Sequence, residues 1–173
     1  MTFRAGIWKD LIPQITGVAA GGAAPAMGGI LASGNIQGYT FQTSDALYGT
    51  FELPADYQEG TDLTVHLHWM PSSANTGNLV WAFEYSVANI GSVSGAPTVL
   101  PNTSVPAGVA WTHQISTFAT TIPGAGLKIQ SIIVFRLLRN NTGNGFTGNA
   151  ILTSLGAFYQ ADSMGSNSQT TKN

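Results

Sequence analysis

The chain has 173 residues, enough for one domain with a substantial core, and 43% of them are hydrophobic. Only 8% are Asp, Glu, Lys or Arg, against roughly 25% in typical soluble domains, and the formal net charge is −2. Six scattered cations cannot follow a phosphate backbone, so we expect no nucleic-acid partner, and the lack of cysteine excludes disulfides and thiolate metal sites.

Residues 1–38 differ in composition from the rest of the chain. The apolar stretch at 11–32 is interrupted by prolines and glycines, so it predicts neither a transmembrane helix nor a signal peptide, and we expect no membrane partner. Several large apolar residues stand near its start, too many for a solvated tail. We therefore expect an extended N-terminal arm that lies across a neighbouring subunit, with a flexible leader as the alternative. The candidate contact residues are Phe3, Ile7, Trp8, Leu11 and Ile12.

The remainder, residues 39–173, predicts strands and turns. Residues 45–53, 62–70 and 79–88 alternate bulky and smaller side chains with the period of two that a half-buried strand needs. The second and third of these are expected to form a hairpin across a short Pro/Gly/Asn-rich turn. Further strands are expected at 98–100, 109–121, 129–139 and 150–160, with a second hairpin turn at 140–149 and a polar tail at the end. The pattern favours an all-β, jelly-roll-like antiparallel sandwich.

Three histidines are the strongest sign of catalytic chemistry. His66 and His68 project from one face of the same strand and can ligate one metal, with His113 as a third nitrogen ligand. Their spacing is similar to the start of the first cupin motif, and cupins are jelly rolls. That motif expects a glutamate where this chain has Ser72 and Ser73, and the second cupin motif has no match around His113. We therefore expect no metal, and histidines that are hydrogen-bonded at a sheet face or a subunit interface.

Glu84 and Arg136 form the other constellation of interest. Charges are so few that a carboxylate and a guanidinium on two central strands suggest a partly buried ion pair. Other enzyme classes lack their signatures: acids for a glycosidase fall mostly in turns, and the chain has no nucleophile elbow, phosphate-binding loop or dinucleotide fingerprint. We expect no catalytic residue and no cofactor. The candidate structural polar cluster consists of His66, His68, Glu84, His113 and Arg136.

Several ordered blocks resemble one family of tailed-bacteriophage virion structural proteins. The blocks are WKDL at 8–11, LPxDYxEGTD at 53–62, HxHW at 66–69, GNxVWxxEYxxANI at 77–90, DxMGS at 162–166 and KN at 172–173. The resemblance covers most of the chain from residue 8 onward. It implies a virion component with a β-sandwich body and no enzymatic activity.

Together, these features predict a capsid decoration (cement) protein that binds and stabilises the head shell. Low surface charge favours a closed oligomer, expected to be a homotrimer, with the major capsid protein or other virion proteins as partners. The expected location is the virion, at the capsid surface or the head–tail region. A collar, head-fibre or tail-associated protein is the alternative within the virion. Outside that class, the alternatives are a cupin-like metalloenzyme using His66, His68 and His113, and a carbohydrate-binding module.

Overall fold

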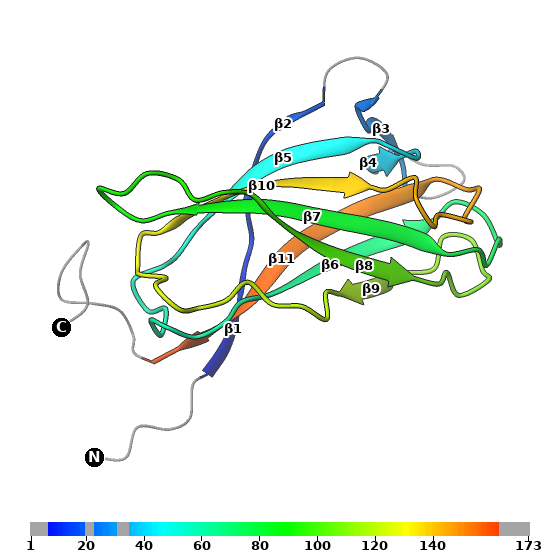
Figure 1. Ribbon diagram of the computed structural model, residues 1–173. Helices are drawn as coiled ribbons and strands as arrows, with labels where there is room; N and C mark the ends of the chain where they lie inside the picture. The colour runs from blue at the N-terminus through cyan, green and yellow to red at the C-terminus, as the bar shows by residue number, and fades with distance from the viewer. Residues whose placement is uncertain (1–6, 20–22, 31–34, 163–173) are drawn as a thin grey trace.

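The computed structural model describes residues 7–19, 23–30 and 35–162 (Figure 1). Within them the chain forms strands and no α-helix, and hence no helix that could cross a membrane. The strands are β1 (Ile7–Leu11), β2 (Gln14–Val18), β3 (Ala26–Gly29), β4 (Gln37–Phe41), β5 (Ala46–Glu52), β6 (Thr64–Pro71), β7 (Leu79–Ala88), β8 (Thr98–Ser104), β9 (Gln114–Thr117), β10 (Ile132–Arg139) and β11 (Ala150–Ala161).

The strands make two antiparallel sheets packed face to face. Sheet A has the order β3-β4-β11-β6-β9, with β1 also paired to β11, and sheet B has the order β2-β5-β10-β7-β8. From β4 to β11 the chain changes sheet at every connection except that between β7 and β8, which is the winding of a jelly roll. The predicted all-β, jelly-roll-like antiparallel sandwich is therefore confirmed.

Both predicted hairpins are wrong. Strands β6 and β7 lie in different sheets, as do β10 and β11, so the turns at 72–78 and 140–149 carry the chain across the sandwich. A Gly/Asn-rich turn reverses the chain in either case, and its sequence does not say whether the next strand pairs or crosses over. The strand expected at 109–121 is also shorter, since Trp111 has a φ of 65° and β9 spans only Gln114–Thr117.

The hydrophobic core lies between the sheets and is built from alternate strand residues. On β6, Val65, Leu67 and Trp69 are fully buried, and on β7 the same is true of Trp81 and Phe83. The inward faces predicted for these two strands are therefore correct. Burying side chains of this size contributes roughly 1.5 to 3 kcal/mol each before the entropy cost of ordering them.

The described part of residues 1–38 lies along the chain's own sandwich. Strand β1 pairs with the second half of β11, and β2 pairs with β5, so this segment adds a strand to each sheet. Strand β3 pairs with β4 at the outer edge of sheet A. The backbone of the segment is thus anchored within the same molecule, whatever its exposed side chains contact.

Candidate functional site

The outer face of sheet A carries His66 in an unusual setting. Its side chain is buried, stacks on Phe158 of β11 with ring centroids 3.9 Å apart, and places Nε2 3.5 Å from Asp10 Oδ2 of β1. Strand β11 runs between β6 and β1, and the residue opposite His66 is Gly156. A Cβ there would lie 2.5 Å from Asp10 Oδ1 and 2.8 Å from His66 Cε1. The two side chains therefore meet across β11 because position 156 is glycine.

The surroundings of His66 favour its neutral form. Burial lowers the pKa of His66, the Asp10 carboxylate acts in the opposite direction, and the neighbouring His68 adds to the lowering. Among the described residues its Nδ1 has no hydrogen-bond partner. A buried neutral ring that stacks on an aromatic neighbour acts mainly as a packing element, with Asp10 holding one of its nitrogens.

His68 and His113 form a second, more exposed pair. His68 Nδ1 and His113 Nε2 are 2.7 Å apart, and the rings stack with centroids 5.0 Å apart. The left-handed turn at Trp111, whose N–H donates to the Pro71 carbonyl oxygen at 2.7 Å, brings the 111–113 segment against β6. The sequence pattern placed these histidines on strands, but it gave no sign of this turn.

The histidine geometry suits hydrogen bonding. The facing nitrogens of His68 and His113 are engaged with each other, and Nε2 of His66 is directed at Asp10 on the other side. In the part of the chain that the structure describes, no group of three or more His, Asp or Glu side chains is arranged to hold a metal ion. The arrangement can transfer a proton between His68 and His113, and it can hold surface strands in register.

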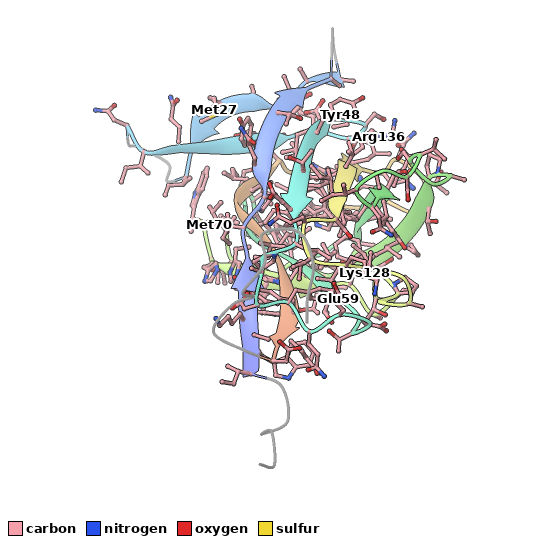
Figure 2. The ribbon with its side chains drawn as sticks, turned by 90° about the vertical axis from the view of Figure 1, so that its left-hand side faces the viewer. Met27, Tyr48, Glu59, Met70, Lys128 and Arg136 are labelled. Carbon is pink, nitrogen blue, oxygen red and sulfur yellow. The ribbon has the colours of Figure 1, made fainter. Side chains whose placement is uncertain are left out.

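Glu84 and Arg136 form the ion pair expected from the sequence. Arg136 Nε lies 3.1 Å from Glu84 Oε2, the two residues are register partners on β7 and β10, and both side chains are about one-third exposed. This pair occupies the outer face of sheet B, near Tyr48 (Figure 2). It is therefore on the opposite side of the sandwich from the histidines. The structure divides the candidate polar cluster into two separate groups.

The candidate contact residues of the arm are placed on β1 and just after it. Ile7, Trp8 and Ile12 are 62%, 56% and 61% exposed, whereas Leu11 packs against the core. Phe3 lies outside the described residues. Three of these side chains are thus available to a partner, and Leu11 belongs to the chain's own core.

Strand β1 is held by a polar group that sequence reasoning missed. Lys9 Nζ pairs with Asp56 Oδ2, and the Tyr159 hydroxyl donates to Asp56 Oδ1 at 3.0 Å. Burial alone raises the pKa of Asp56, but the hydrogen bonds from Lys9 and Tyr159 lower it overall. Burial and the bond to Asp56 raise the pKa of Tyr159 to about 12. The available signal was the concentration of scarce charges in WKDL and LPADY.

A second missed residue, Arg139, organises one end of the sandwich. Its buried guanidinium donates to the carbonyl oxygens of Phe41 at 2.9 Å, Gly148 at 2.7 Å and Phe146 at 2.5 Å. Burial lowers the pKa of Arg139 to about 10, so the group keeps its charge at neutral pH. An open hollow of about 540 Å³ lies beside it, lined partly by Asn144 and Asn149. Because the guanidinium donates its hydrogen bonds to backbone carbonyl oxygens, its role is structural.

No protein-family model matches the chain, and a search of curated proteins finds no match to it. The resemblance to virion structural proteins therefore stays a prediction from the sequence, beside a fold that the structure establishes.

Proposed function

We propose that the chain is a non-enzymatic structural protein of a tailed-phage virion. In this proposal it decorates the head shell as a cement protein, forms trimers and binds the major capsid protein. The proposal combines the block resemblance of the sequence with the properties of the folded surface.

The observation that carries the proposal is the apolar character of that surface. Large hydrophobic side chains are exposed on several sides of the sandwich, while the whole sequence has only six cations and eight acids. Few charged groups stand on this surface to keep neighbouring molecules apart. The exposed hydrophobic side chains on strands or beside them are Ile7, Trp8, Ile12, Val18, Met27, Ile36, Tyr48, Val99, Val105, Ile115, Ile132 and Val134. Such a surface suits a subunit that is covered by neighbours in an assembly.

The polar contacts also support a structural role, because they connect distant parts of the chain. The Asp10–His66 contact, the Lys9–Asp56 pair and the Arg139 bonds each connect segments that are far apart in the sequence. Each therefore braces the sandwich. A protein that must resist force on a particle benefits from cross-strand ties of this kind.

The proposal is tested on particles of the virus that encodes the chain. Mass spectrometry and a cryo-EM map of purified particles should find the protein in many copies on the head. Detection only at a collar or tail would overturn the shell placement, and absence from particles would overturn the virion role.

Shell binding is tested with purified components. Undecorated shells mixed with the protein should become decorated and more resistant to heat. Replacing Ile7 and Trp8 by serine should lower the occupancy of the shell at least threefold, because both side chains are exposed on β1, which pairs on one side only, with β11. The matched control replaces Ile90 and Val93, which are exposed on the loop after β7, and should bind as the parent does.

A further inference from the structure

A short segment between β8 and β9, residues 107–113, is attached to the sandwich by few polar contacts. It begins after Pro106, which is buried, and the structure shows two hydrogen bonds between it and the rest of the molecule. One is the 2.7 Å bond from the Trp111 N–H to the Pro71 carbonyl oxygen, and the other is the 2.7 Å contact of His113 Nε2 with His68 Nδ1. Both bonds lead to β6, so this one strand holds the segment.

The backbone at Trp111 has a conformation that bulky residues rarely adopt. Its φ is 65°, in the left-handed region, where the side chain of an L-residue crowds the following carbonyl oxygen. A residue of this kind stays in such a conformation only where neighbouring contacts hold it. The two hydrogen bonds to β6 supply contacts of that kind on either side of the strained position. The conformation of the segment therefore depends on its attachment to β6.

The contact between His68 and His113 requires one facing nitrogen without a proton. At 2.7 Å the two nitrogens share a single hydrogen, which one ring donates and the other accepts. The bond forms between two neutral rings, and it also forms when one ring is charged. It cannot form when both rings are charged, because each facing nitrogen then carries a proton. Histidine gains its charge between roughly pH 8 and pH 5, so the contact is present at neutral pH and is lost as the pH falls.

The elements packed against the two rings supply no opposite charge. Strands β6, β9 and β11 and the 107–113 segment contain no Asp, Glu, Lys or Arg. The ionisable neighbours are His66, whose ring lies edge-on to that of His68 with centroids 5.4 Å apart, and Asp10 of β1. Asp10 contacts His66 Nε2 at 3.5 Å, so its charge acts first on that ring. Because His113 is exposed, protons from solvent reach the pair directly.

We propose that the contact between His68 and His113 is an acid-sensitive latch. It holds the 107–113 segment against β6 at neutral pH, and the segment separates from β6 once both rings are protonated. The bond from Trp111 to Pro71 then has to hold the strained turn by itself. The two sheets stay paired, because β6 keeps its neighbours β9 and β11. The latch belongs to the folded chain alone and does not depend on the proposed function.

Amide hydrogen exchange of the full chain, followed by NMR at pH 7.5 and pH 5.0, tests the latch. The protection factor of the Trp111 amide, which corrects for the intrinsic effect of pH on exchange, should fall at least tenfold between the two conditions. The amides of Trp81 and Phe83 on β7 should stay better protected than that of Trp111 at both pH values, which shows that the opening is local. Trp111 protection that is the same at both pH values would overturn the proposal.

Substitution of each histidine assigns the effect. His113→Gln removes the change of charge and keeps a side chain that can hydrogen-bond to His68, so its Trp111 protection should fall less than threefold, and His68→Gln should behave in the same way. His66→Asn is the matched control, and its Trp111 amide should lose protection as the parent does. A tenfold fall that persists in both glutamine variants, or that disappears in His66→Asn, would overturn the proposal. Circular dichroism at pH 7.5 confirms that each variant is folded.

Discussion

Replacing Arg139 by methionine should destabilise the sandwich strongly. Methionine has a similar length and keeps the aliphatic packing, but it removes every donor of the guanidinium. The carbonyl oxygens of Phe41, Phe146 and Gly148 then lose the partner that now joins the end of β4 to the turn before β11. The change therefore tests whether one buried side chain holds this end of the two sheets together.

The expected loss follows from the number of oxygens left without a donor. An unsatisfied buried polar group costs about 1 to 3 kcal/mol, so three oxygens set an upper range of about 3 to 9 kcal/mol. Water entering from the adjacent hollow of about 540 Å³ can replace some of these bonds. We expect a loss near the low end, about 3 kcal/mol, which corresponds to about 6 to 12 °C in Tm for a chain of this length.

Urea unfolding followed by circular dichroism measures the free energy of unfolding of each variant. Arg136→Met is the matched control, since Arg136 lies on the same strand and its one ion pair is partly exposed. That variant should lose less than about 1 kcal/mol. The reasoning is refuted if Arg139→Met also loses less than about 1 kcal/mol, or if the two variants are equally stable.

Three further outcomes are expected. Burial lowers the pKa of His66, so the unfolded chain binds more protons at mildly acidic pH, and the free energy of unfolding should fall as pH drops through about 6.5. Urea titrations at pH 7.5 and 5.5 should show a smaller fall for His66→Asn, whereas equal falls would contradict the assignment. Gly156→Ala should lower the free energy of unfolding by about 1 to 3 kcal/mol, because the new Cβ meets Asp10 and the His66 ring. Without that contact, alanine would stabilise a strand relative to glycine. A gain in stability by urea unfolding would show that the two side chains move aside freely. Finally, His66, His68 and His113 should hold no metal, and stoichiometric zinc, iron or manganese by elemental analysis, lost in a His66→Ala and His68→Ala double variant, would overturn this.

The inward faces of the strands were predictable because the side-chain period is two and one face must be apolar. The same alternation placed His66 and His68 together on an outer face, and the scarcity of charge correctly predicted that Glu84 pairs with Arg136. The crossings of the chain between sheets were not predictable, because the turn residues at 72–78 and 140–149 specify a reversal and not a partner.

Strands β1, β2 and β3 escaped the sequence analysis for a different physical reason. They join existing sheet edges through backbone hydrogen bonds and expose most of their side chains, so they need no hydrophobic alternation. The sequence analysis also missed the Asp10–His66 contact, because β1, which carries Asp10, was not predicted as a strand. Gly156 inside a strand was the available signal, because a glycine there often marks the close approach of another group.

The position of β11 has a consequence for synthesis. It is the last strand of the described chain, yet it lies inside sheet A, where it pairs with β1, β4 and β6. Until the ribosome has released residues 150–161, the earlier strands of that sheet lack this neighbour, and the contacts of β11 with β1 and β4 span most of the chain. Sheet A is therefore completed late in synthesis. Translation products that stop before β11 cannot form the complete sheet A, so they lack the finished outer face on which His66 and Asp10 meet.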